Sequence, residues 1–325
     1  MKIGIIGSGQ FGASLAHNFS KNLKEINIWN RSNINKNIII KKLNSLSGEN
    51  LINQLSPYFK IRRSILNVVE NSDIILLCIK AQSLINFLGK NYSFFENKPL
   101  VFCSKGIDSE SCLFQTQIGE KFLNKNKLLA LSGPGFASDI IKQKPIALSL
   151  ACNNQNLGKK VQNIISSPSI RIYLNNDLIG TQLGGALKNV IAIACGVADA
   201  KDLGESAKSA IITRGFYEIR QMGKALGCQV ETLFGLSGLG DLSLTCNSRL
   251  SRNYNFGINI CKNIKKKNDI ETIEGKKTAN AAVLISKKYQ LDLPIIQTVN
   301  DLIDEKIEIS KAIQNLLERP LKNET

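Results

Sequence analysis

The feature that most constrains the fold is a Gly-x-Gly-x-x-Gly motif at residues 7–12, which directly follows an apolar run at residues 3–6. Apolar residues at helical spacing follow the motif, and a second apolar run occupies residues 26–29. A strand, a glycine turn and a helix in this order let backbone N–H groups approach a pyrophosphate at a helix N-terminus. The arrangement therefore predicts a dinucleotide site. The glycines that such a site requires are Gly7, Gly9 and Gly12.

The end of the second apolar run indicates which dinucleotide is bound. An NAD site usually has Asp or Glu at this place to bond the ribose 2′-hydroxyl, whereas an arginine suits a 2′-phosphate. This chain has Asn30 and Arg31 instead. We predict that NADP(H) is preferred, with NAD(H) as the second cofactor. The alternative interpretation of Arg31 is a solvated loop residue.

Length and hydropathy predict a soluble protein of two domains. The chain has 325 residues, of which 43% are hydrophobic, enough for a core in each domain. Lys2 and the apolar run after it resemble the start of a signal peptide, but the glycine motif interrupts the run and no cleavage site follows. No apolar run approaches the roughly 18 residues of a membrane helix. We therefore expect a cytoplasmic protein without a membrane span.

Charge and cysteine usage exclude several classes of function. The net charge is +16, yet lysines are spread along the chain and aromatic residues make up only 6%, which argues against nucleic-acid binding. The densest lysine cluster lies in one polar stretch at residues 262–267. The eight cysteines show no Cys-x-x-Cys spacing, so we expect reduced thiols and neither disulfides nor a metal site.

A single histidine, His17, falls in the predicted cofactor helix, where we expect a structural or surface role. Dehydrogenases that use histidine as acid, base or zinc ligand are therefore excluded. Proton transfer must come from a lysine, a carboxylate or a tyrosine.

The order of predicted elements gives an α/β fold with two domains. Strand patterns alternate with helix patterns up to residue 176, which predicts a doubly wound, largely parallel sheet. From residue 177 the patterns are helical. We place a dinucleotide-binding domain at 1–176 and a helical substrate-binding domain at 177–325, with the active site between them. The expected strands are 3–6, 26–29, 73–79, 100–104, 127–131, 146–151 and 170–174, and the expected later helices are 177–198, 206–226, 252–263, 278–288, 294–302 and 311–318.

Two segments at predicted strand ends could meet a ligand, because doubly wound sheets bind ligands at the carboxyl ends of their strands. Lys105 follows the strand at 100–104, and a glycine-rich segment at 132–137 follows the strand at 127–131. Each has an ordinary alternative, an exposed lysine in one case and a simple turn in the other.

Lys188 lies inside the long apolar helix predicted at 177–198, one turn from Gly184, Gly185, Ile191 and Ala192. A buried ammonium is costly unless it is paired or its pKa falls, and such a lysine can donate a proton near neutral pH. The alternative interpretation is a lysine that extends to solvent from the helix edge.

Two later segments offer partners for this lysine and for a phosphate. Asp241 lies in a glycine-flanked loop and could orient Lys188 or a substrate hydroxyl. Ser251, Arg252 and Asn253 precede a predicted helix, a pattern typical of a phosphate site. The alternative is simple capping by Ser251 with Arg252 in solvent.

Taken in order, these motifs resemble the bacterial NAD(P)-dependent glycerol-3-phosphate dehydrogenase family. The resemblance runs from Gly7 to about Pro294 and is most specific at residues 184–190, 212–215, 238–246, 251–257 and 274–275. It implies a Rossmann-type domain followed by an all-α domain like the C-terminal domain of 6-phosphogluconate dehydrogenase. It also implies reversible reduction of dihydroxyacetone phosphate to sn-glycerol 3-phosphate, which supplies glycerophospholipid synthesis.

The resemblance further implies residue roles, with Lys188 as the acid-base residue at the C2 oxygen. The substrate-binding positions that it implies are Lys105, Gly133, Gly135, Lys188, Asp241, Ser251, Arg252 and Asn253. The cofactor-binding positions are Gln10, Phe11, Arg31, Lys105, Ala137, Arg252, Thr272 and Glu274, beside the three glycines.

Two positions depart from the family pattern, since Gly135 replaces a Ser or Thr and Ser206 replaces an Asn. We expect weaker or shifted substrate contacts there but retained activity. The alternatives are another lysine-dependent NADP reductase similar to ketopantoate reductase, or a non-catalytic NADP(H)-binding redox sensor. The sequence leaves the oligomeric state open, with a homodimer as one expectation.

Overall fold

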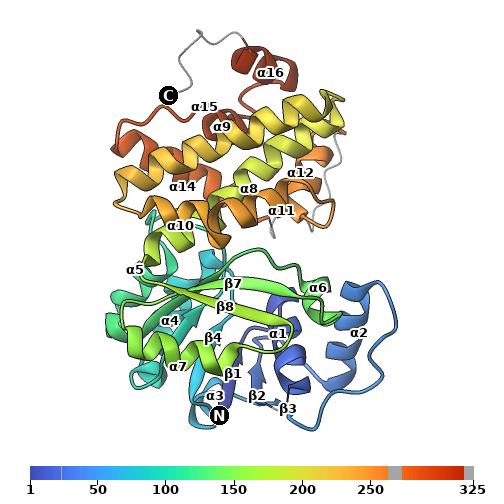
Figure 1. Ribbon diagram of the computed structural model, residues 1–325, viewed down its shortest axis with the longest axis vertical. Helices are drawn as coiled ribbons and strands as arrows, with labels where there is room; N and C mark the ends of the chain where they lie inside the picture. The colour runs from blue at the N-terminus through green and yellow to red at the C-terminus, as the bar shows by residue number, and fades with distance from the viewer. Residues whose placement is uncertain (23, 263–272, 318–325) are drawn as a thin grey trace.

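The computed structural model describes all residues except 23, 263–272 and 318–325. Figure 1 shows a domain built on a β-sheet and a helical domain stacked along the longest axis of the molecule. The N-terminus lies at the far end of the sheet domain, and the last helix lies at the far end of the helical domain.

The sheet has eight strands in the order β3-β2-β1-β4-β5-β6-β7-β8. Neighbouring strands run parallel, except that β7 is antiparallel to β6, so the prediction of a largely parallel sheet is confirmed. β3 has only three residues, which is too short for the sequence pattern to have predicted it. The strands are β1 Lys2–Ile6, β2 Glu25–Trp29, β3 Phe59–Ile61, β4 Ile74–Leu77, β5 Leu100–Phe102, β6 Leu128–Ser132, β7 Ile146–Ala151 and β8 Ile170–Asn175.

Helices cover both faces of this sheet, because successive side chains of its central strands point to opposite faces and both sets are apolar. In β1, Ile3 and Ile5 enter one buried cluster, whereas Ile6 enters the cluster on the other face. The α-helices of this domain are α1 Gln10–Lys21, α2 Lys36–Ser47, α3 Ile65–Glu70, α4 Leu84–Asn91, α5 Gln115–Glu120, α6 Ala137–Ile141 and α7 Gln155–Ile165.

The helical domain is organised around α8 (Leu178–Ala200), which begins after an N-cap at Asp177 and packs against α9, α11, α12 and α14. The Asp177 side chain accepts from Gly180 N at 2.7 Å, which satisfies one free N–H of the first turn. The other helices are α9 Gly204–Ala225, α10 Val230–Phe234, a π-helical turn Leu236–Gly240, α11 Asp241–Cys246, α12 Arg252–Cys261, α14 Glu274–Lys288, α15 Pro294–Ile303 and α16 Ile309–Leu317.

Helix α8 also corrects the expectation that no segment approaches a membrane span. Among the described residues it alone has the length and apolar composition to cross a bilayer. However, 83% of its most apolar 18-residue window is buried inside the protein, so α8 is the core helix of its domain.

Candidate active site between the two domains

A cleft of about 290 Å³ lies where the carboxyl ends of β1, β4, β5 and β6 meet the helical domain. Its walls come from the segments after these strands and from α8, α11, α12 and α14. The strand order reverses between β1 and β4, which is the place where doubly wound sheets bind their ligands. The cleft therefore has the position of a cofactor site.

The glycine turn after β1 has the shape that a pyrophosphate requires. Gly7 has φ +104°, and a Cβ on it would lie 2.5 Å from the carbonyl oxygen of Cys78, so a side chain is excluded. Gly9 is the N-cap of α1, and a Cβ on it would meet no atom within 4 Å. No side chain caps α1, which leaves its first N–H groups for an anion in that open space. These residues fit a dinucleotide cofactor.

At the far side of this turn, the end of β2 offers no carboxylate to a ribose. Asn30 uses its Oδ1 to accept from Ser8 N at 3.1 Å and its Nδ2 to donate to Ser32 Oγ at 2.6 Å. Arg31 follows Asn30 and is exposed. The arginine side chain therefore follows β2 at the place where an NAD-selective site has a carboxylate.

The centre of the site is a buried carboxylate between two lysines. Lys188 Nζ donates to Asp241 Oδ1 at 2.5 Å, and Lys105 Nζ donates to Asp241 Oδ2 at 2.7 Å. The side chain of Lys188 is 8% exposed, that of Lys105 17% and that of Asp241 1%. The alternative in which Lys188 extends to solvent is therefore wrong. One carboxylate neutralises only one of the two ammonium groups, so the cluster retains positive charge next to the cleft.

Thr245 and Gly133 complete this cluster. Thr245 Oγ1 accepts from Lys188 Nζ at 2.7 Å and donates to the Asp241 carbonyl at 2.6 Å, while the Gly133 carbonyl accepts from Lys105 Nζ at 2.8 Å. Asp241 and Thr245 are four residues apart on α11, so their side chains share a face of that helix. Each ammonium is thus held by at least two oxygens.

The glycines before Lys188 explain how α8 comes close enough to form this cluster. A Cβ on Gly184 would lie 2.5 Å from the Ser237 carbonyl oxygen, and one on Gly185 would overlap Ser132 Oγ. Any larger residue at either position would push α8 away from the end of β6 and from the loop before Asp241. The small residues on this helix are therefore required for close packing.

Burial and charge set the protonation of the site. Burial lowers the pKa of Lys188, Asp241 opposes this shift and Lys105 adds to it, so that the pKa is about 8. Burial raises the pKa of Glu274, while nearby cations, Arg252 first among them, pull that pKa down. A lysine whose pKa is about 8 can donate and recover a proton near neutral pH.

The start of α12 forms another wall of the cleft. Ser251 caps this helix by accepting from Tyr254 N at 3.2 Å, as the capping interpretation predicted. Arg252 is exposed and lines the cleft beside it. Asn253 donates to Asn189 Oδ1 at 2.9 Å and accepts from Gly275 N at 3.0 Å, so it connects three helices.

Comparison with known proteins identifies the family to which this architecture belongs. The NAD-dependent glycerol-3-phosphate dehydrogenase N-terminal model matches residues 2–158, and the C-terminal model of the same family matches residues 177–314. A glycerol-3-phosphate dehydrogenase [NAD(P)+] of Ruegeria sp. is 37% identical over the full length of both chains. The chain belongs to the NAD-dependent glycerol-3-phosphate dehydrogenase family. The predicted resemblance is confirmed.

Solved structures agree with this assignment. A glycerol-3-phosphate dehydrogenase from Coxiella burnetii is 26% identical, with a TM-score of 0.86 that covers 98% of this chain and 99% of that one. A putative 2-dehydropantoate 2-reductase from Enterococcus faecalis is 12% identical, with a TM-score of 0.54. The match covers 96% of this chain and 99% of that chain, and at this identity it shows a shared fold alone. The N-terminal Rossmann-like domain and the helical C-terminal domain are those of the family.

In this family member, most residues singled out from the sequence line one cleft. Gly7, Arg31, Gly133 and Asp241 do not line it; Gly7 shapes the turn, and Gly133 and Asp241 hold the lysines. Thr272 lies outside the described residues. The predicted residues that line the cleft are Gly9, Gln10, Phe11, Gly12, Lys105, Gly135, Ala137, Lys188, Ser251, Arg252, Asn253 and Glu274.

The sequence analysis missed Asn189 and Thr245, which also line the cleft. Both had a signal, because Asn189 adjoins Lys188 and Thr245 lies one helical turn after Asp241. Of the two departures from the family pattern, only Gly135 lines the cleft, whereas Ser206 is exposed on α9.

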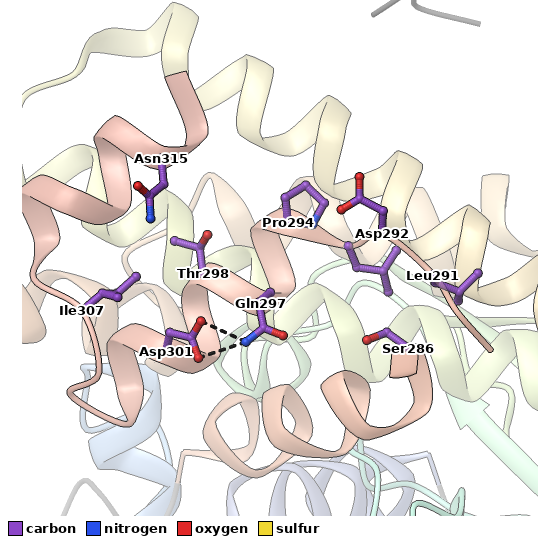
Figure 2. Close-up of a pocket in the computed structure, with 10 residues that line it drawn as sticks. Ser286, Leu291, Asp292, Pro294, Gln297, Thr298, Asp301, Ile307 and Asn315 are labelled. Atoms are coloured by element: carbon purple, nitrogen blue, oxygen red, sulfur yellow. Dashed lines mark hydrogen bonds between the residues drawn. The ribbon is translucent and has the colours of Figure 1, made fainter. Parts of the chain in front are cut away.

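A second cavity of about 290 Å³ lies in the helical domain (Figure 2). It is lined by residues of α14, α15 and α16 and the turns between them, and Asp301 accepts from Gln297 Nε2 at 2.9 Å within it. None of its lining residues was predicted to be a site residue, and none belongs to the cleft between the domains.

Proposed function

We propose that the protein catalyses the reversible, NAD(P)H-dependent reduction of dihydroxyacetone phosphate to sn-glycerol 3-phosphate, which supplies glycerophospholipid synthesis. The main support for the proposal is the buried Lys188, which is paired with Asp241 and lines the same cleft as the glycine turn. A ketone reductase needs this combination of a cofactor site and a proton donor.

Lys188 is the proposed acid-base residue. A bound nicotinamide cofactor supplies the hydride that reduces the carbonyl carbon C2. The C2 oxygen then gains negative charge, and Lys188 Nζ donates a proton to it. Asp241 and Thr245 hold Nζ in place, and the remaining charge of Lys105 favours the oxyanion. In the oxidation direction, neutral Lys188 accepts the proton of the C2 hydroxyl.

We propose that the N-terminus of α12 binds the phosphate of the substrate. Arg252 supplies a guanidinium that can bond two phosphate oxygens, and α12 supplies the N-terminal N–H groups. Ser251 and Asn253 are proposed substrate contacts, together with Lys105 and the backbone near Gly133 and Gly135. The lysine-rich composition of the chain favours anionic substrates in general.

The proposed cofactor contacts are the three glycines with Gln10, Phe11 and Ala137, and Arg252 and Glu274 on the helical side. Arg31 is the proposed partner of a 2′-phosphate, so NADPH is the preferred cofactor. Binding of NADPH and NADH to Arg31→Ala tests this assignment. The variant should lose affinity for NADPH about tenfold while NADH affinity is retained. Equal losses for both cofactors would remove Arg31 from cofactor selection.

Three further proposals concern the domain boundary, the oligomeric state and the location in the cell. The domain division at 176/177 is supported by the end of β8 at Asn175 and the start of α8 at Leu178. A homodimer and a cytoplasmic location remain proposals, and light scattering of the purified protein tests the first.

The experiment that tests the function follows NADPH absorbance with purified protein and dihydroxyacetone phosphate, with ketopantoate and NADH in parallel. Oxidation of NADPH that depends on the phosphorylated triose supports the proposal. Oxidation with ketopantoate alone would favour the other reductase. A protein that binds NADPH but oxidises it with neither substrate would favour the redox sensor.

A further inference from the structure

A second lysine reaches the glycine turn from outside the cleft. Lys42 lies on α2, and its Nζ donates to the carbonyl oxygen of Ser8 at 2.6 Å. Ser8 lies between Gly7 and Gly9, and its N–H donates to Asn30 Oδ1. The ammonium of Lys42 therefore lies where α2, the glycine turn and the end of β2 meet.

The packing of α2 holds this side chain inward. Ile39 and Leu43 are fully buried, and Lys42 is half-buried beside them, whereas its neighbour Lys41 is exposed. Burial lowers the pKa of Lys42. The Ser8 carbonyl uses one of the three N–H donors of the ammonium, so two can serve a ligand.

The surroundings favour an anion at this place. The segment 30–48, which joins β2 to the end of α2, contains no Asp or Glu but carries Arg31 as well as Lys42. The hydroxyl of Ser8 is buried and has no hydrogen-bond partner among the described residues. A dinucleotide on a glycine turn places its adenosine ribose between that turn and the end of the second strand.

We propose that Lys42 is a specificity-determining residue that binds the 2′-phosphate of NADP(H), together with Arg31. The proposal rests on the NADP(H) preference proposed above. Two cations from different elements, one after β2 and one on α2, would hold the phosphate from two sides. Charge-assisted hydrogen bonds of this kind discriminate strongly against a ribose that lacks the phosphate.

A purely structural role makes a different prediction. If Lys42 only fixes the Ser8 carbonyl, its loss disturbs the glycine turn and weakens every adenine nucleotide to the same degree. If it binds the 2′-phosphate, its loss weakens only ligands that carry that group. The ratio of two affinities therefore separates the roles.

The test is calorimetric titration of Lys42→Gln with adenosine 2′,5′-bisphosphate and with AMP, without substrate. We expect binding of the bisphosphate to weaken about tenfold while AMP affinity is retained. Lys41→Gln, on the exposed side of the same helix, is the matched control and should bind both nucleotides like the wild type. Equal weakening of both nucleotides, or no weakening, would overturn the proposal.

A measurement on the wild-type protein covers the case in which Lys42→Gln does not fold. Acetic anhydride acetylates neutral lysines, and mass spectrometry reports the rate at Lys42. The bisphosphate should protect Lys42 more than saturating AMP does, and equal protection would contradict the proposal.

The outcomes also separate this proposal from the one on which it rests. A wild type that binds both nucleotides equally would reject the NADP(H) preference and the role of Lys42 with it. A wild-type preference that persists in Lys42→Gln would reject the role of Lys42 alone. Neither result depends on whether the triose phosphate is reduced.

Discussion

The two walls of the cleft recognise ligands by different means. At the glycine turn, the sheet wall presents mainly backbone, with open space over Gly9 and a helix N-terminus that has no side-chain cap. The helical wall presents charged side chains, and Asp241, the carboxylate that holds its Lys188, is 1% exposed. Backbone N–H groups bind a phosphate without any titration, whereas a buried lysine changes its pKa and can transfer a proton.

This difference separates cofactor binding from chemistry. The sheet wall should determine which nucleotide binds, and the helical wall should determine the rate and its pH dependence. Substitutions of Lys188 and Asp241 should therefore leave nucleotide affinity intact, and the buried histidine behind the sheet wall should affect stability alone.

The largest effect is expected from Lys188→Met, which keeps most of the aliphatic stem and removes the ammonium. Asp241 retains Lys105 as a partner, so no buried charge is left alone. We expect kcat to fall about 10³-fold, because the proton donor is lost, with NADPH affinity unchanged. Stopped-flow turnover and calorimetric NADPH binding check both parts.

The control for this variant is Lys201→Met, at the exposed end of α8. It should retain wild-type turnover. A Lys188→Met enzyme that keeps its turnover would show that the proton comes from another group, and one that loses NADPH binding would show that the two walls are not separable.

A smaller effect on rate is expected from Asp241→Asn, which leaves two buried ammonium groups without their carboxylate. We expect about 10²-fold slower reduction and a loss of about 3 kcal/mol in the free energy of unfolding. Glu205→Gln, which removes an exposed partner of Lys208, should cost less than about 1 kcal/mol.

The pH dependence sharpens this test. In the wild type, reduction requires protonated Lys188, so its rate should fall as pH rises through about 8. Asp241 raises the pKa of Lys188, and its loss should move the falling limb to lower pH. A limb that stays in place in Asp241→Asn would contradict the assignment of that limb to Lys188.

The sheet wall could be predicted from sequence because its site is built locally. The glycine turn, its strand and its helix are contiguous, so the motif at residues 7–12 and the apolar runs around it were sufficient. The antiparallel β7 was not predictable, because apolar patterning does not report strand direction. The short β3 offered no clear pattern at all.

The cluster of Lys105, Lys188 and Asp241 between the two walls depends on contacts between distant residues. Lys105 and Asp241 are 136 positions apart, and Lys188 and Asp241 are 53 apart. The apolar, glycine-rich surroundings of Lys188 predicted that this lysine is buried, but no local pattern predicts that one carboxylate serves two lysines. Thr245 was missed for the same reason, since its role appears only once α11 lies against α8.

The smallest effect, confined to stability, is expected at His17, behind the sheet wall. His17 is 1% exposed on α1, so its role is structural and it is not a surface residue. Both its ring nitrogens lack hydrogen-bond partners among the described residues. Burial, with a smaller contribution from Lys21, lowers the pKa of His17 from 6.5 to about 4. Between these two pH values the unfolded chain binds a proton that the folded protein excludes, so stability falls as pH falls.

Urea unfolding of the wild type and of His17→Leu at several pH values measures this loss of stability. The wild type should lose as much as about 3 kcal/mol more than the variant between pH 6.5 and 4, because all other titrating groups are common to both. Above pH 7 the difference between them should not change with pH. Parallel curves across the whole range would mean that His17 titrates in the folded protein as it does in the unfolded chain. The sheet wall would then contain a titrating group after all, and its contrast with the helical wall would have to be withdrawn.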